Sequence, residues 1–272
     1  MANGMWISVS GAQTQADRLD LISNNLANAD TDGYKKDGPT FKEYLASQET
    51  LHEKVDIPRG SFRDKDFYPL YGKDSSFVVM DGTSTDFKPG HLKVTENPLD
   101  IAMDGPGFLE VATKEGVRFT RLGALKIAPD GRLVTSDGSS VLSAQASGLA
   151  TGTSPLAREI HLRDRVGSLA ISQQGHIMVG GELITRLSVV EFQNLDKLKK
   201  TGSQLFENVD PENQRVARET RVRQGMLEAS NVNAVEEMSH MISANRIFEQ
   251  NLKALKTYGE LMGKEVNEVG KL

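Results

Sequence analysis

The chain has 272 residues, of which 38% are hydrophobic and 25% are charged, a balance typical of a folded globular protein. Its formal net charge of −5 argues against a nucleic-acid partner, because phosphate binding requires clustered Lys and Arg. The sequence contains no cysteine, so disulfides and thiolate metal sites are excluded. The pairs Lys35-Lys36 and Lys199-Lys200 are interpreted as solvated charge, since neither belongs to a longer basic run.

Near the start of the chain, apolar residues recur at steps of three and four, which predicts a helix from about residue 3 to about residue 29. The seam through which we expect it to pack comprises Val9, Ala12, Ala16, Leu19, Ile22 and Leu26. Few charges lie away from this seam, so we expect the helix to be packed on several sides. The segment 29–33 ends the helix, because Asp and Thr favour turns and Gly tolerates positive φ.

The middle of the chain has the pattern of strands. Residues 34–75 contain repeated Gly and Pro, which predicts an extended connector with one short helix around 41–48. Residues 76–199 alternate short apolar runs with Asp-Gly and Gly-Gly turns, which predicts an antiparallel sandwich or barrel-like fold. The candidate strands are 76–80, 91–95, 99–103, 108–113, 132–135, 159–162, 168–172, 176–179 and 182–192.

Residues 200–227 are interpreted as a second extended connector, after which Ser230-Asn231 can cap another helix. The apolar seam of this second helix comprises Val235, Met238, Ile242, Phe248, Leu252, Leu255 and Met262. We therefore predict an α+β fold in which long N- and C-terminal helices pair as a coiled-coil-like bundle, with a central antiparallel all-β domain. The expected domains are a discontinuous helical assembly domain (1–33 and 228–272), the connectors (34–75 and 200–227) and the β domain (76–199).

The sequence contains no recognisable constellation for catalysis, so we expect no enzymatic activity, no cofactor, no metal and no small-molecule substrate. No two of its five histidines lie within four residues of each other, which excludes the zinc-binding helix motif. There is no Gly-x-Ser-x-Gly nucleophile elbow. The alternatives to a structural protein are a cell-wall hydrolase, which would need a carboxylate pair or a nucleophile in a cleft, and a soluble partner-binding adaptor.

No run of 18 apolar residues occurs, so we expect no membrane insertion. The first 25 residues have no basic start followed by an apolar core, and we expect no cleaved secretory signal peptide. This pattern fits either a cytoplasmic protein or a protein exported by a route that leaves the N-terminus intact.

Several separated motifs resemble one family. Residues 20–35, DLISNNLANADTDGYK, closely resemble the N-terminal signature of the bacterial flagellar rod and hook proteins, and residues 225–238 resemble the C-terminal signature. The patches at 98–102, 107–108 and 119–123 resemble parts of the family's β domain. The signature positions are Asn24, Asn25, Leu26, Ala27, Asn28, Gly33, Tyr34, Ser230, Asn231 and Val232.

The resemblance implies a structural subunit of the flagellar basal-body rod, which spans the periplasm. Its terminal helices are expected in the inner tube and its β domain in an outer layer. The implied partners are other rod proteins, copies of the same chain and the flagellar type III export apparatus, which leaves the N-terminus uncleaved. The family's export motif is Phe followed, after three residues, by an apolar residue, and Phe41 and Leu45 match it.

The length and the single β domain argue against a hook protein, which usually carries additional outer domains. The segment 242–249 differs from the pattern typical of distal-rod members and favours a proximal-rod member. Trp6 is shared by many distal-rod members and supports the alternative. We therefore expect a proximal-rod protein, with a distal-rod protein and a hook-type axial protein as the alternatives.

Overall fold

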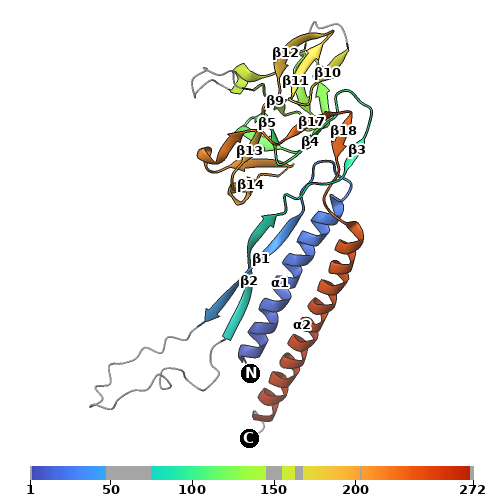
Figure 1. Ribbon diagram of the computed structural model, residues 1–272. Helices are drawn as coiled ribbons and strands as arrows, with labels where there is room; N and C mark the ends of the chain where they lie inside the picture. Colours follow the sequence, from blue (N-terminus) through green and yellow to red (C-terminus); the bar gives the residue numbers. More distant parts are fainter. Residues whose placement is uncertain (1, 47–74, 145–154, 163–167, 203, 270–272) are drawn as a thin grey trace, which may run out of the picture. The chain divides into compact units, whose positions relative to one another are not determined.

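The computed structural model describes residues 2–46, 75–144, 155–162, 168–202 and 204–269 (Figure 1). The chain forms two compact units, each assembled from separated segments. The helical unit comprises residues 1–24, 38–83 and 235–272, and the β unit comprises residues 25–37 and 84–234. Each unit is described by itself below.

The helical unit is built on two long α-helices and a pair of strands. These elements are α1 (Ala2–Ala27), α2 (Ala234–Val269), β1 (Asp37–Ala46) and β2 (Ser75–Thr85). Both terminal helices predicted from the apolar spacing are therefore present. The helices lie side by side and run in opposite directions, so the two ends of the chain lie at the same end of this unit (Figure 1).

Helix α1 contacts α2 on one side and β2 on another. A Cβ atom at Gly11 would come within 3.1 Å of the Asn251 side-chain nitrogen, so the missing side chain allows α2 to approach closely. On the side of β2, the Thr14 hydroxyl donates a hydrogen bond to the Val78 carbonyl at 2.8 Å. These contacts position α1 between a helix and a strand.

The predicted coiled-coil-like bundle is wrong, although the two helices do pair. Among the described residues α1 and α2 are the only α-helices, and α1 also packs on a strand. The inward face of α2, buried or half-buried, includes Glu237, Met241, Ala244, Phe248, Asn251 and Leu255. Most of the predicted seam of α2 is exposed instead. The prediction selected the wrong face because this helix has two faces with apolar residues at the same spacing.

The short helix expected around 41–48 is also wrong where the structure describes it. Residues 41–46 belong to β1, which pairs with β2 in a two-stranded sheet. Thr40, Phe41 and Tyr44 have side chains that favour strands, and a partner strand was not visible in the local sequence. Residues 47 and 48 lie outside the described part of the chain.

The β unit consists of short strands in antiparallel pairs. Its strands are β3 (Leu92–Val94), β4 (Ile101–Asp104), β5 (Phe108–Thr113), β6 (Gly116–Thr120), β7 (Leu125–Ile127), β8 (Leu133–Thr135), β9 (Ser140–Val141), β10 (Leu169–Ile171), β11 (His176–Val179), β12 (Glu182–Arg186), β13 (Val189–Phe192), β14 (Leu198–Lys200), β15 (Leu205–Asn208), β16 (Gln214–Val216), β17 (Arg221–Gln224) and β18 (Met226–Glu228). The main sheet has the order β14-β15-β6-β5-β9-β8-β7, and β13 pairs with both β5 and β16.

Smaller sheets join distant parts of the sequence to this centre. They are β10-β11-β12, β17-β4 and β18-β3. The last two pairs bring the segment 221–228 beside 92–104, so the part expected as a return connector contributes strands. The predicted strand 182–192 is divided into β12 and β13, and the segment expected as a strand at 159–162 forms only isolated bridges.

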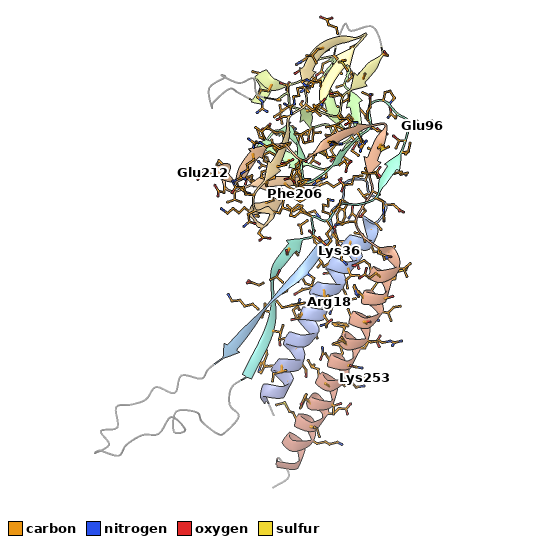
Figure 2. The ribbon with its side chains drawn as sticks, in the orientation of Figure 1. Arg18, Lys36, Glu96, Phe206, Glu212 and Lys253 are labelled. Atoms are coloured by element: carbon orange, nitrogen blue, oxygen red, sulfur yellow. The ribbon has the colours of Figure 1, made fainter. Side chains whose placement is uncertain are left out.

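The β unit has two buried clusters. The first is aliphatic and includes Ile101, Leu109 and Ile177, all fully buried. The second is aromatic and includes Phe108 and Phe206, whose ring centroids lie 5.7 Å apart in an edge-on arrangement. Figure 2 shows Phe206 among the side chains of the β unit. Such edge-on pairs stabilise a core beyond the burial of their area.

We predict that Phe206→Ala lowers the free energy of unfolding of the β unit by about 3–5 kcal/mol, because it removes a buried ring and leaves a cavity. Chemical denaturation followed by circular dichroism measures the change. Val209→Ala is the control, since Val209 is exposed and its truncation removes little buried area. Equal effects of the two substitutions would contradict the assignment of the aromatic core.

Candidate functional site: a buried ionic cluster and two exposed apolar faces

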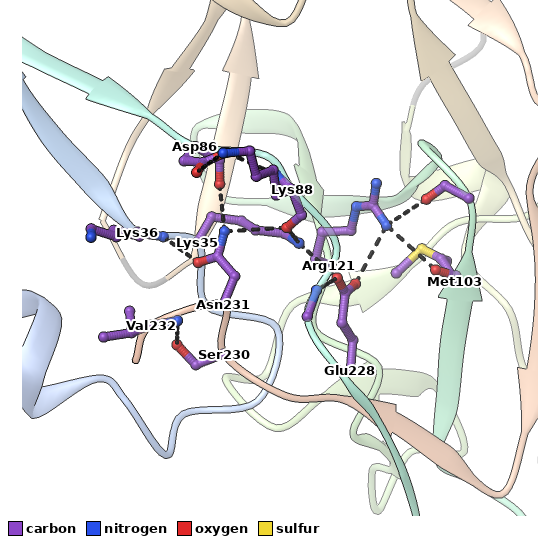
Figure 3. A network of polar contacts seen from close by, with 12 residues as sticks. Lys35, Lys36, Asp86, Lys88, Met103, Arg121, Glu228, Ser230, Asn231 and Val232 are labelled. Carbon is purple, nitrogen blue, oxygen red and sulfur yellow. Dashed lines mark hydrogen bonds and ion pairs between the residues drawn. The ribbon is translucent and has the colours of Figure 1, made fainter. Parts of the chain in front are cut away.

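A buried ionic cluster in the β unit joins three segments that are far apart in the sequence (Figure 3). The Lys35 ammonium donates to Glu228 Oε1 at 2.6 Å and to the Lys88 carbonyl at 2.8 Å. The Arg121 guanidinium lies 3.4 Å from Glu228 Oε2 and donates to the Gly105 carbonyl at 2.8 Å. One carboxylate therefore faces two cations.

The cluster depends on its own internal pairing, because water does not reach it. Lys35, Arg121 and Glu228 are each at most 2% exposed. Burial lowers the pKa of Lys35 and that of Arg121, and the negative charge of Glu228 opposes both changes. The Arg121 guanidinium also lies 4.6 Å from the centre of the Phe108 ring, which links the cluster to the aromatic core.

The chain crosses between the two units four times, and the β-unit residues next to these crossings are hydrogen bonded to one another. The Asn25 amide donates to the Asp37 carbonyl at 2.8 Å, and the Thr85 hydroxyl donates to the Asp37 carboxylate at 2.7 Å. The Asn231 amide donates to the Asp86 carbonyl at 2.8 Å. We call this set, together with the ionic cluster, the junction cluster.

The structure gives physical roles to several signature residues. Gly33 has a φ of 73°, and a Cβ atom there would lie 2.8 Å from the Arg121 carbonyl oxygen, so a side chain is excluded. The buried Tyr34 hydroxyl donates to Asn25 Oδ1 at 3.1 Å. The Asn231 side-chain oxygen accepts a hydrogen bond from the backbone N–H of Lys36 at 2.7 Å.

The other signature residues are less central to these contacts. The Ser230 hydroxyl accepts from the Val232 N–H at 3.2 Å, just before α2 begins. Leu26 and Asn28 are half-buried, whereas Asn24 and Ala27 are exposed. Any functional role of these residues stays a prediction.

Sequence reasoning missed the junction cluster. Its interpretation of Lys35 as solvated charge is wrong, because the residue is 1% exposed. Lys35, Arg121 and Glu228 each lie inside a patch that carries the family resemblance, which was the available signal. Nothing in the local sequence indicates that these patches meet.

The predicted assembly residues divide into an inner and an outer set. Ala12 and Ile22 are buried, and Ala16, Leu19, Leu26, Phe248 and Leu255 are half-buried. The exposed residues are Val9, Val235, Met238, Ile242, Leu252 and Met262. We call Val235, Met238, Ile242 and Leu252 the apolar stripe of α2. Their assembly role is not tested by a single chain and stays a prediction.

A groove of about 290 Å³ lies between α1 and β2 in the helical unit. Trp6, Val9, Val78 and Val79 give it an apolar surface, and Asp17 adds a negative charge at its edge. Trp6 is 56% exposed and Val79 is 52% exposed, which is unusual for such large apolar side chains. The groove and the apolar stripe are thus two exposed apolar surfaces in one unit.

Of the two residues in the predicted export motif, Phe41 is exposed on β1. The side chain of Leu45 lies outside the described part of the structure. In the described ranges, no three His, Asp or Glu side chains are grouped to hold a metal ion. No helix within those ranges has both the length and the apolar character needed to cross a membrane.

We predict that Lys35→Met lowers the free energy of unfolding by about 3–5 kcal/mol, because Glu228 and the Lys88 carbonyl lose a buried partner. Lys88→Met is the matched control. The Lys88 side chain is 82% exposed and pairs with Asp86 at the surface, so its loss should cost about 0–1 kcal/mol. Urea titration measures both changes, and similar values would show that the buried pair contributes little.

Family models match three parts of the chain. A model described as flagella basal body rod protein matches residues 5–35, and one described as flagellar hook protein FlgE/F/G D1 domain matches residues 102–179. A third, described as flagellar basal body rod FlgEFG protein C-terminal, matches residues 223–269. Together they include α1, much of the β unit and α2.

Curated relatives align over almost the full length of both chains. The chain is 28% identical to the flagellar basal-body rod protein FlgF of Caulobacter vibrioides, over 100% of each chain. It is 29% identical to FlgG of Bacillus subtilis, over 98% of this chain and 99% of the relative. It is 26% identical to the flagellar hook-basal body complex protein FlhO of Bacillus subtilis, again over 100% of each. The chain belongs to the flagellar basal-body rod protein family.

Proposed function

We propose that this protein is a structural subunit of the flagellar basal-body rod, of the FlgF type, which assembles through its terminal helices. The observation that carries the proposal is the pair of exposed apolar surfaces on α1–β2 and α2, in a chain whose two ends match rod-protein models. A soluble monomer rarely leaves such surfaces uncovered, whereas a polymer subunit buries them against its neighbours. The role is structural rather than enzymatic, and the partners are other rod proteins.

The finer parts of the proposal concern export and position. The chain leaves the cytoplasm through the flagellar type III apparatus without cleavage and takes its place in the part of the rod that crosses the periplasm. The full-length similarity to FlgF and the departure at 242–249 from the distal-rod pattern support the proximal position. The similarity to FlgG and the presence of Trp6 support a distal-rod role as the second candidate.

Gene deletion in the bacterium that encodes the chain separates these two candidates. Loss of a proximal subunit should stop assembly before distal-rod proteins enter the isolated basal body. Loss of a distal subunit should leave a short rod without its distal part. Both candidates would be contradicted if the deletion strain formed normal basal bodies and the basal bodies of the parent strain did not contain the chain.

We predict that Ile242→Asp prevents incorporation into basal bodies while the free protein remains folded. Ile242 is 57% exposed, so the monomer tolerates the carboxylate, but a packed subunit contact would have to desolvate it. Gln250→Asp is the matched control, because Gln250 is a polar, exposed residue of the same helix that lies off the apolar stripe. Immunoblots of isolated basal bodies and a motility assay measure the difference, and normal motility with Ile242→Asp would contradict the assembly role of the stripe.

We predict that Phe41→Ala lowers secretion through the flagellar apparatus with little change in stability. The ring is exposed on β1, so its removal creates no buried cavity. The neighbouring exposed Lys42→Ala serves as the control. The ratio of secreted to cytoplasmic protein measures export, and an unchanged ratio for Phe41→Ala would remove Phe41 from the export motif.

A further inference from the structure

The β unit is completed by one segment near its C-terminal end, residues 221–231, which we call the closing segment. It forms both β17 and β18, which pair with β4 and β3. Its residue Val222 belongs to the aliphatic cluster, and the Gln224 side-chain amide donates to the Pro98 and Leu169 carbonyls. All of these partners precede the closing segment in the sequence, so they are synthesised before it.

The closing segment also holds the segment 33–36, which follows α1 (Figure 3). The Glu228 backbone carbonyl accepts a hydrogen bond from the Gly33 N–H at 2.6 Å. The Glu228 carboxylate accepts one from the Lys35 ammonium, also at 2.6 Å. Because Lys35 and Glu228 are 193 positions apart, the segment 33–36 is present long before the residue that binds it.

Without the closing segment, the centre of the β unit would contain two cations that lack a carboxylate in contact with them. In the described part of the chain, Lys35 and Arg121 both form their ion pairs with Glu228. Arg121 would retain neutral partners such as the Gly105 carbonyl. Lys35 would retain the Lys88 carbonyl. Neutral partners of this kind do not balance two charges that are buried together.

Asp86 does not replace Glu228 as the partner of the two cations. Its carboxylate attracts Lys35, but it is partly exposed and pairs with the Lys88 ammonium at 3.4 Å. Burial lowers the pKa of Lys35, and the like charge of Arg121 lowers it further. Burying both cations before Glu228 is present therefore disfavours the closed arrangement by a factor on the order of a hundred or more in population.

We propose that Glu228 sets the order in which the β unit folds: Lys35 and Arg121 keep the segment 33–36 undocked until the closing segment brings the Glu228 carboxylate to both of them. Antiparallel neighbours that are close in sequence, such as β5 and β6, form first because their contacts are local. The segment 33–36 and the closing segment dock last, and they dock together.

The consequence for export rests on the proposed function, in which the chain leaves the cytoplasm through the flagellar apparatus. An open chain can pass through an export channel in an extended form, whereas a closed β unit would first have to unfold. The closing segment is followed by α2, so most of the chain is present before the unit closes. Late closure thus keeps the chain competent for export.

Refolding of the full chain with pulsed hydrogen exchange tests this order. The Asp86 N–H donates to the Lys36 carbonyl at 2.8 Å, so it reports docking of the segment 33–36 without involving Glu228. The Leu142 N–H donates to the Glu110 carbonyl at 3.0 Å and reports the main sheet. In the unmodified chain we expect Leu142 to be protected from exchange before Asp86.

The variant Glu228→Gln keeps the size of the side chain and removes its charge. Protection of Asp86 should become about tenfold slower or should not develop, while protection of Leu142 keeps its rate. Glu219→Gln is the matched control, because Glu219 is an exposed carboxylate just before the closing segment, and both rates should stay unchanged. Unchanged protection of Asp86 in Glu228→Gln would overturn the proposal, and so would equal slowing of Leu142.

A chain that combines Lys35→Met, Arg121→Met and Glu228→Met separates the effect of charge from that of strand pairing. Folded proteins tolerate the replacement of a buried ion cluster by apolar side chains of similar size. No unpaired cation opposes docking in this variant, so Asp86 should be protected earlier than in the unmodified chain, at a time close to that of Leu142. Protection as late as in the unmodified chain would show that strand pairing alone sets the order and would overturn the role of Glu228.

Secretion in the bacterium that encodes the chain separates this inference from the proposed function. The triple variant closes early, so its ratio of secreted to cytoplasmic protein should fall below that of the unmodified chain. Equal ratios would overturn the link between closure and export. An unmodified chain that the flagellar apparatus does not secrete would refute the proposed function instead, and the refolding measurements on the purified chain would still decide the folding order.

Discussion

The buried pairing of Glu228 with Lys35 and Arg121 is the interaction on which the arrangement of this chain depends. Lys35 and Glu228 are 193 positions apart, so their contact closes most of the sequence into a loop. Burying three charges is costly, and the cost is offset because the carboxylate meets both cations and backbone groups satisfy several of the remaining donors and acceptors. Such a cluster tolerates few alternative arrangements, which favours one specific path for the chain.

Hydrogen bonds around this cluster extend its effect to all four crossings between the units. Asn25 and Asn231 each use both ends of the side-chain amide: Asn25 bonds the N–H and the carbonyl of Asp37, and Asn231 bonds the Lys36 N–H and the Asp86 carbonyl. The two residues belong to the N-terminal and C-terminal signatures, respectively. The signature residues thus hold the segment at the end of α1 and the segment just before α2 at fixed points of the β unit.

The two units place their apolar residues differently, and this difference supports a division between folding and assembly. The β unit buries Ile101, Phe108 and Phe206 completely and has its own aliphatic and aromatic clusters. The helical unit leaves Trp6, Val79 and Ile242 largely exposed. Hydrophobic burial that a single chain leaves incomplete remains available to drive contact with neighbouring subunits.

The amino-acid sequence alone determined the two terminal helices, the β character of the middle and the family to which the chain belongs. These features follow from local periodicity, turn residues and contiguous motifs, all of which are encoded within short segments. Only the tertiary structure decided which face of α2 is inward, because Met241 and Met238 both lie on apolar faces with the same helical spacing. It alone showed that Lys35 is buried. A charged side chain can be buried where a partner of opposite charge lies beside it, and the partner of Lys35, Glu228, is distant in the sequence. The strand pairs of 221–228 with 92–104 were hidden for the same physical reason, because the local pattern of a segment does not show which distant segment pairs with it.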